Sequence, residues 1–223
     1  MRLVITDAQL LKQWHRVLRL QPSQRVTLFN DSKDTASWRI EALSAKQAIL
    51  THVASLAPRT PSHAVTLAWS VLKKENNDWI IQKATELGVT QLIPLQAEHC
   101  VANRISTVKQ DRWQKIIVEA AEQCGRSDVP QLQQLSSPQQ ALRQLQGAGV
   151  VCVADMDGLK SIAQVVQSES AASVFIGPEG GWSAAERSIF QSSGAVAVTL
   201  GDFTLRAETA AIVAVATMIL WLP

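Results

Sequence analysis

The amino-acid sequence predicts an α/β protein preceded by a small β-module. Short, nearly continuous apolar runs alternate with helical patterns from about residue 69 onward, which is typical of buried parallel strands joined by helices. The first part of the chain instead contains short strand-like runs separated by turn-forming residues. With 223 residues, 47% of them hydrophobic, the chain suits one large domain or two small ones and is not a disordered chain.

The first part of the chain predicts a small β-domain. Residues 26–29 and 38–43 are expected to form strands, and residues 30–34 a turn between them. A linker-like stretch follows at residues 56–62, with Pro58 and Pro61. We therefore place one domain at residues 1–66 and a second, α/β domain at residues 67–223.

The next elements alternate in type. Residues 65–71 and 89–95 are apolar runs that predict strands. Residues 78–87 and 111–124 place apolar side chains at helical spacing, and each run is followed by a glycine, Gly88 and Gly125. Glycine is favoured directly after a helix because it adopts the left-handed conformation without strain.

The last third of the chain continues this alternation. Residues 150–154, 173–176 and 196–200 predict buried strands. Ser183 followed by Glu186 fits a capping box that begins a helix, and residues 208–220 predict a final apolar helix. The Gln-rich residues 131–146 are expected to be a solvated surface segment.

One candidate binding loop runs from Phe175 to Ser183, where a buried strand enters a Gly-rich turn and then a capped helix. Ligands of open α/β sheets bind beyond the carboxyl ends of strands, and glycines allow the backbone to approach them closely. The alternative is a tight turn without a ligand. The loop has neither the dinucleotide-binding glycine spacing nor a Walker A sequence.

The second candidate loop runs from Leu200 to Ala210. Arg206 precedes the apolar helix, although a helix N-terminus disfavours a basic residue and favours an acid such as Glu208. Either the two side chains pair across the helix start, or Arg206 points into the same pocket as the Gly-rich loop. Two loops at adjacent strand ends would form one site.

Charge is unevenly distributed along the chain. The formal net charge is only +2, but residues 1–68 hold nine Lys/Arg against four Asp/Glu, whereas residues 127–223 hold four against eight. The basic first part suits a polyanion, and its cationic candidates for phosphate contacts are Arg2, Lys12, Arg16, Arg19, Arg25 and Arg39.

Cysteine usage and hydropathy limit the remaining classes of protein. Cys100, Cys124 and Cys152 are odd in number and far apart, so we expect neither a disulfide framework nor a metal site. No run reaches the ~18 apolar residues of a membrane helix, and the N-terminus lacks a secretory signal. We therefore expect a cytoplasmic protein with no membrane partner.

Four motifs occur in an order that is similar to one family. They are DWIIQKATELGV at residues 78–89, VEAAEQCGR at 118–126, IGPEGG at 176–181 and LRAETA at 205–210. Together they resemble the bacterial 16S ribosomal RNA uridine N3-methyltransferases of the SPOUT superfamily. The match extends to Arg2 and to residues 17–19.

This resemblance implies a PUA-like RNA-binding β-barrel at residues 1–66 and a SPOUT methyltransferase domain with a deep C-terminal trefoil knot at residues 67–223. It implies a homodimer that uses S-adenosylmethionine, with S-adenosylhomocysteine as product and no metal, to methylate N3 of one uridine in 16S rRNA of the small subunit. The residues implied in cofactor binding are Ile176, Gly177, Pro178, Gly180, Gly181, Leu200, Gly201, Leu205 and Thr209.

Methylation at N3 requires loss of a proton and spreads negative charge onto the uracil carbonyl oxygens. A fixed cation aimed at those oxygens stabilises that charge, so we assign this catalytic role to Arg206, with Glu208 orienting it or relaying the proton. The candidate RNA-binding residues are Arg2, Arg16, Arg19, Arg25 and Arg126.

The sequence departs from the family pattern at three places. Phe203 and His99 stand where the family usually has arginine, and Asn76-Asn77 stand where a basic residue is usual. These changes leave two alternatives open. The chain could be a SPOUT homologue that binds RNA without catalysis, or a methyltransferase that modifies a different RNA position.

Overall fold

The computed structural model describes residues 1–30, 32–73, 75–100 and 105–223. The chain divides into two units, one of Met1–Thr60 with Arg126–Asp128 and one of Pro61–Gly125 with Val129–Pro223. The boundary predicted between residues 66 and 67 lies inside strand β5 (Ala64–Ser70). The limits of the two domains stay a prediction.

The first unit is built on a four-stranded antiparallel sheet. Its strand order is β1 (Arg2–Ile5), β4 (Ala48–Leu56), β3 (Thr35–Leu43) and β2 (Arg25–Phe29). Helix α1 (Ala8–Lys12) continues into a π-helical turn, η1 (Gln13–Val17). The core of this unit contains Leu11, Trp14, Trp38, Ile40, Ala48 and Leu50. The two strands predicted here are confirmed as β2 and β3.

The second unit contains a seven-stranded sheet in which every paired neighbour is parallel. Its order is β7 (Gln131–Leu132), β6 (Gln91–Leu95), β5, β10 (Ala171–Ile176), β8 (Val150–Ala154), β11 (Val196–Thr199) and β9 (Lys160–Ser161). The predicted α/β class is confirmed.

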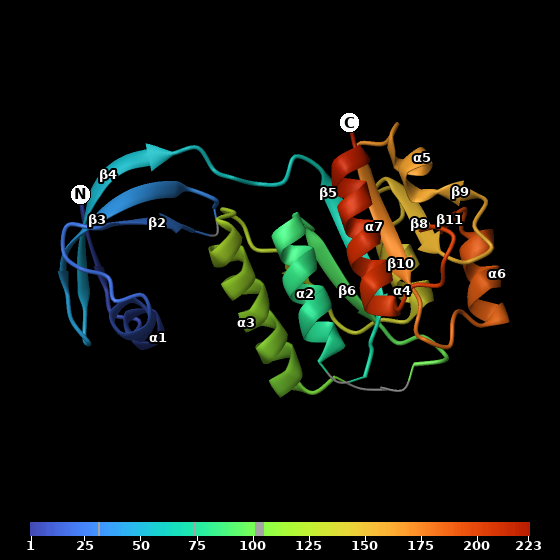
Figure 1. The fold of residues 1–223 in the computed structure, drawn as a ribbon, viewed down its shortest axis with the longest axis horizontal. Coiled ribbons are helices and arrows are strands. Elements are labelled where there is room, and N and C mark those ends of the chain that lie inside the picture. Colours follow the sequence, from blue (N-terminus) through green and yellow to red (C-terminus); the bar gives the residue numbers. More distant parts are fainter. Residues whose placement is uncertain (31, 74, 101–104) are drawn as a thin grey trace. The chain divides into compact units, whose positions relative to one another are not determined.

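Helices cover both faces of this sheet. Successive side chains of a strand point to opposite sides, and the apolar side chains on each side pack against a different set of helices. On β10, Val174 packs in one core with helices α2, α3, α5 and α7, and Phe175 packs in the other with α4 and α6. Figure 1 shows α2 and α7 in front of the strands. These helices span Asn76–Leu87, Thr107–Cys124, Ile162–Val166, Ala207–Trp221, Pro138–Gln144 and Ala184–Ser192, respectively.

The predicted helix ends are confirmed. Gly88 and Gly125 follow α2 and α3 with φ of 106° and 74°, values that side chains with a Cβ rarely adopt. Ser183 and Glu186 form the capping box of α6. Among the helical tryptophans, Trp113 is fully buried, whereas Trp79 on α2 is 45% exposed.

The expectation of a solvated surface segment at residues 131–146 holds for most of the glutamines, which are exposed, but not for the segment as a whole. These residues contain β7 and α4, and α4 begins with a capping box of Ser137 and Gln140. Ala141, Leu142 and Leu145 are buried against the sheet. Glutamines dominate the composition, yet these few apolar side chains suffice to pack the helix.

Within the described residues, no helix combines the length and the apolar character needed to cross a bilayer. The three cysteines are free thiols. Burial raises the pKa of Cys152 to about 12, so this thiol stays protonated and acts as an apolar core group.

The loop between β8 and β9 lies directly against β11. Asp155 N donates to Val198 O at 3.0 Å. A Cβ atom at Gly158 would lie 2.4 Å from the carbonyl carbon of Val198 and 2.6 Å from Thr199 N. Because backbone cannot move as a flexible side chain can, only glycine fits at this position.

Replacing Gly158 with alanine should therefore lower the free energy of unfolding by about 1–3 kcal/mol, the usual cost of overpacking. Urea denaturation measures the change. The control is Leu159→Ala, which alters the same loop at a side chain that is 98% exposed and should change stability by less than ~0.5 kcal/mol. Equal stability of Gly158→Ala and the wild type would contradict the close approach.

Candidate functional site

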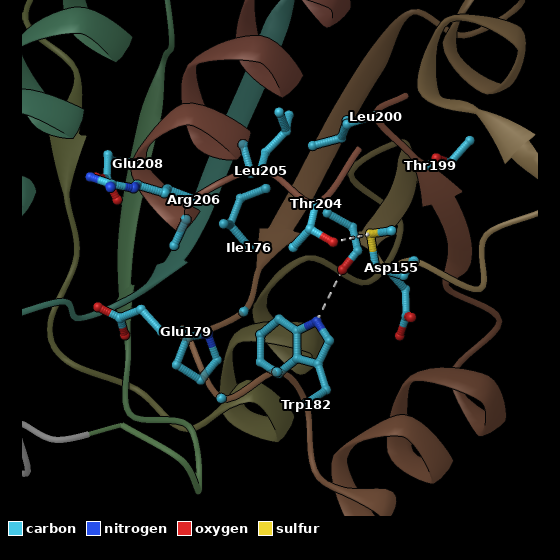
Figure 2. A pocket seen from close by; sticks show the side chains of 18 of the residues that line it. Asp155, Ile176, Glu179, Trp182, Thr199, Leu200, Thr204, Leu205, Arg206 and Glu208 are labelled. Atoms are coloured by element: carbon cyan, nitrogen blue, oxygen red, sulfur yellow. Dashed lines mark hydrogen bonds between the residues drawn. The ribbon is translucent and has the colours of Figure 1, made fainter. Parts of the chain in front are cut away.

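A cleft of about 700 Å³ opens in the second unit where β8, β10 and β11 end. Three loops line it, and they follow these three strands. Figure 2 shows Ile176, the last residue of β10, near Leu200, Thr204 and Leu205 from the loop after β11, and Trp182 from the loop after β10. Parallel strands deliver their following loops to one edge of the sheet, which is where α/β proteins bind ligands.

The two loops predicted from the sequence meet in this cleft. Every residue predicted to bind the cofactor lines it, with the exception of Thr209, an exposed residue of α7 that lies outside the lining in the described chain. Arg206 and Glu208 also line it. The strands that carry the two loops are not adjacent, however, because β8 lies between β10 and β11.

Strand β8, which lies between β10 and β11, contributes a third loop to the cleft, and the sequence did not predict it. Asp155 and Met156 follow β8 and line the cleft. Thr204 Oγ1 lies 3.8 Å from Met156 Sδ, which joins the loop after β8 to the loop after β11. Asp155 comes directly after a correctly predicted strand, but only the strand order shows that this strand ends at the cleft.

Asp155 also forms an ion pair with Arg187, another cleft residue that sequence reasoning missed. The carboxylate of Asp155 is 7% exposed, and the guanidinium of Arg187 reaches Asp157 as well, at 3.3 Å. Arg187 belongs to α6, so the pair connects this helix to the loop after β8.

Trp182 holds the Gly-rich loop against β8. Its indole Nε1 donates to Ala154 O at 3.3 Å, drawn as a dashed line in Figure 2. Its ring packs edge-on against Phe190 at a centroid distance of 4.8 Å. A Cβ at Gly177 would lie 3.1 Å from the same ring, so a larger residue before Pro178 would require the indole to shift.

The buried carboxylate of Glu186 fixes the start of α6. Its Oε2 accepts from Ser183 N, and its Oε1 accepts from Glu98 N in the segment after β6, both at 2.9 Å. The next residue, His99, places Nδ1 at 3.2 Å from Gly180 O and 3.0 Å from Gly181 O. A position that departs from the family pattern thus contacts the predicted binding loop directly.

Arg206 stands at the N-terminal boundary of α7 with an extended backbone, φ −63° and ψ 150°. Its side chain is exposed and Glu208 is half-buried. In the described part of the chain, no ion pair within 4.0 Å joins them. In Figure 2, Arg206, Glu208 and Glu179 lie on one side of the cleft and Asp155 on the other. Arg206 thus presents a cation at the cleft that is not paired with Glu208.

Phe203 lines the rim of the cleft and is 82% exposed. Asn76 also lines the cleft, whereas its neighbour Asn77 is fully buried. The Asn77 side chain accepts from Trp69 Nε1 and from Leu72 N, and donates to Leu72 O. Of the two asparagines that stand where the family usually has a basic residue, Asn76 therefore lines the cleft and Asn77 stabilises the fold.

The predicted RNA-binding arginines lie in the first unit in different environments. Arg16, Arg19 and Arg25 are exposed, and the first two line a hollow of about 460 Å³. Arg2 pairs with Glu41 at 3.0 Å. Arg126 is 7% exposed, and its Nε and Nη2 each lie 2.9 Å from the carboxylate of Asp128. This geometry suits Arg126 to a structural role.

Two further side chains, the carboxylate of Glu41 and the thiol of Cys100, have a shifted pKa. A hydrogen bond from the Thr51 hydroxyl lowers the pKa of Glu41. Desolvation opposes this shift, and the charge of Arg2 adds to it. Burial raises the pKa of Cys100. Across the described residues, no group of three or more His, Cys, Asp or Glu side chains is arranged to hold a metal ion.

Residues 58–219 match the family model described as an RNA methyltransferase domain. The chain belongs to this family. Curated relatives include two proteins named ribosomal RNA small subunit methyltransferase E. The one from Synechocystis sp. is 33% identical over 217 residues, covering 95% of this chain and 71% of the relative. The one from Helicobacter pylori is 30% identical, covering 89% and 86%.

A Bacillus subtilis protein of the same name is 34% identical over 157 residues, and the match spans 61% of its length. Among solved structures, a ribosomal RNA small subunit methyltransferase E from Neisseria gonorrhoeae bound to S-adenosyl methionine has a TM-score of 0.90 at 28% identity and covers 99% of this chain and 92% of its own. The family resemblance stated from the motifs is confirmed.

Proposed function

We propose that this member of the RNA methyltransferase family transfers a methyl group from S-adenosylmethionine to N3 of a uridine in 16S rRNA of the small ribosomal subunit. The observation that carries the proposal is the cleft in which the IGPEGG and LRAETA motifs meet, with Arg206 at its edge. The Neisseria gonorrhoeae relative, whose name links it to ribosomal RNA, holds S-adenosylmethionine in its solved structure.

The residues of the cleft fit the proposed methyl donor. Its volume of about 700 Å³ is within the usual 300–1,000 Å³ of small-molecule sites. Ile176, Leu200 and Leu205 provide apolar surface for an adenine ring, and the Gly-rich loop exposes backbone groups for polar contacts. Glu179 and Glu208 supply negative charge for a donor that is cationic at sulfur.

When bound, S-adenosylmethionine supplies the methyl group and leaves as S-adenosylhomocysteine. The protein's part is to orient the uracil and to stabilise the anion formed when N3 loses its proton. In this proposal Arg206, which lines the cleft, stabilises the carbonyl oxygens that carry this charge. Glu208, two residues further along α7, orients the guanidinium or accepts the proton. The walls of the cleft fix the in-line approach of the two reactants.

The reaction is tested by incubating the protein with labelled S-adenosylmethionine and small subunits from a strain that lacks the modification, followed by nucleoside mapping. Label on uridine N3 supports the proposal. Label on another base or on ribose supports a methyltransferase with a different target. Donor binding without transfer supports an RNA-binding homologue that has lost catalysis.

We also propose that the second unit contains the trefoil knot typical of SPOUT proteins and that the first unit is a PUA-like RNA-binding module. In support of the knot, the chain leaves β8, passes through β9 and α5 to β10, and crosses β8 again to reach β11 before α7 returns over β5 and β10. The loop after β8 contacts the segment around Val198 along this path.

Arg206→Ala should lower the rate of methyl transfer by about 100- to 1,000-fold, because it removes the group that stabilises developing negative charge. Single-turnover kinetics measure the rate, and calorimetry should find donor affinity within about twofold of the wild type. Arg143→Ala, an exposed arginine of α4, is the control and should keep full activity. Normal turnover of Arg206→Ala would remove Arg206 from the mechanism.

Changing Arg16, Arg19 and Arg25 together to glutamine should weaken RNA binding and reduce its salt dependence. The slope of log K against log salt should fall by about 0.7–0.9 for each phosphate that the variant no longer neutralises, with unchanged S-adenosylmethionine affinity. The control removes the same charge from the second unit by changing Lys115, Arg143 and Lys160 to glutamine. Equal slopes for both triple variants would mean that the arginines of the first unit do not contact RNA.

We further propose that the chain acts as a homodimer. Beyond its first turn, helix α7 consists almost entirely of apolar residues, and such helices are normally buried; yet Leu220 and Trp221 are 79% and 54% exposed. Changing both to serine should raise the dissociation constant of the dimer, as measured by sedimentation velocity. The control is Leu159→Ser, at an exposed loop residue. A monomeric wild type, or an unchanged dimer in the double variant, would contradict the proposal.

A further inference from the structure

The segment that follows β6 is attached at two points, to the start of α6 and to the Gly-rich loop that lines the cleft. Glu98 N donates to the buried carboxylate of Glu186 at 2.9 Å. The His99 ring reaches the Gly-rich loop, with Nδ1 at 3.0 Å from Gly181 O and 3.2 Å from Gly180 O. The first contact fixes the backbone next to His99, and the second joins its side chain to the loop.

The backbone that carries His99 is fixed independently of the cleft. Gln96 N donates to Ser136 O at 2.9 Å, and Cys100 N closes a turn onto Ala97 O at 3.0 Å. Ala97 is 4% exposed and packs in the core beneath α4 and α6. His99 therefore extends from a rigid support, which allows it to restrain the loop rather than follow it.

The partners of the ring determine which nitrogen carries the proton. Both partner atoms are carbonyl oxygens, which only accept hydrogen bonds, so Nδ1 must be the donor. Both the neutral Nδ1–H tautomer and the imidazolium ion meet this requirement. A Cβ at Gly180 would lie 3.0 Å from His99 Cβ, closer than an ordinary contact, so a larger residue at position 180 would require the histidine or the loop to shift.

These contacts fix the orientation of the loop backbone. A peptide group is planar, so a carbonyl held by His99 also sets the direction of the N–H that follows it. Gly181 N already donates to Pro178 O at 2.9 Å in the same turn. The turn at residues 178–181 is thus closed from inside by its own hydrogen bond and held from outside by the histidine.

We propose that His99 is a positioning residue for the methyl donor, which holds the carbonyls of Gly180 and Gly181 so that the loop keeps its binding conformation. This inference rests on the proposed use of S-adenosylmethionine in the cleft. His99 occupies a position at which the family commonly carries arginine, and either side chain can donate to a carbonyl. The histidine does so with one fixed ring nitrogen.

Three substitutions separate this role from simple packing. His99→Asn keeps an amide donor at the position of Nδ1, His99→Gln moves the donor one atom further out, and His99→Ala removes it. Calorimetry with S-adenosylmethionine should give a dissociation constant about 5- to 10-fold higher for His99→Ala and His99→Gln, the usual effect of removing one hydrogen bond. His99→Asn should stay within about twofold of the wild type.

Steady-state kinetics supply a second readout. KM for the donor should rise in His99→Ala while kcat stays within about twofold, because the loop binds the donor and does not contact the reacting atoms. The affinity for RNA should not change. In ¹⁵N-labelled wild-type protein, the nitrogen chemical shifts of the neutral His99 ring should report the Nδ1–H tautomer.

Equal donor affinity in all three variants, or an affinity that asparagine does not restore, would overturn the role of His99. So would a rise in the RNA dissociation constant with unchanged donor affinity, or an Nε2–H tautomer. The failure of the proposed function is distinguishable from these results, because it would appear as a wild-type protein that does not bind S-adenosylmethionine at all.

Discussion

The pairing of β8 with both β10 and β11 is the constraint on which the candidate site depends. Each of these three parallel strands ends at the same edge of the sheet, so the loops that follow them converge without any long-range signal in the loops themselves. The same pairing forces the chain to cross β8 between β10 and β11. It also brings Gly158 against the backbone of β11, where no larger residue fits.

A few polar contacts turn this convergence into a defined cleft. Trp182 joins the Gly-rich loop to the end of β8, and Arg187 joins α6 to Asp155. Glu186 uses both carboxylate oxygens, one inside its own capping box and one on the segment after β6. Contacts of this kind restrain the loops, and such preorganisation reduces the entropic cost of binding.

The uneven charge of the chain agrees with the two proposed activities, RNA binding by the first unit and binding of a cationic methyl donor by the second. The near-neutral total conceals a basic first part, where Arg16, Arg19 and Arg25 are exposed, and an acidic last part. Exposed arginines can contact phosphates, whereas Arg126 is buried beside Asp128. Burial and pairing therefore distinguish an arginine that maintains the fold from one that is available to a polyanion.

The proposed role of His99 illustrates how far apart in sequence the parts of the cleft lie. In the sequence it is a departure from a family pattern, about eighty residues before the loop that it contacts. Its ring reaches the Gly-rich loop only because β6 ends beside β5, and the segment after β6 is bound by Glu186 from the start of α6. A hydrogen bond between such distant positions has no local sequence signal, because it is the packing of the whole sheet and its helices that brings the two segments together.

The sequence by itself determined the α/β class, most helices and strands of the second unit, the family, and the two loops that contain the cleft residues. The family follows from the resemblance of four motifs. The fold class, the elements and the loops follow from local properties, since apolar periodicity, capping residues and glycines act over a few neighbouring positions. The tertiary structure decided what depends on strand order and on packing between distant segments. It placed Asp155 and Met156 in the cleft, left Thr209 outside its lining, and packed the Gln-rich segment as α4.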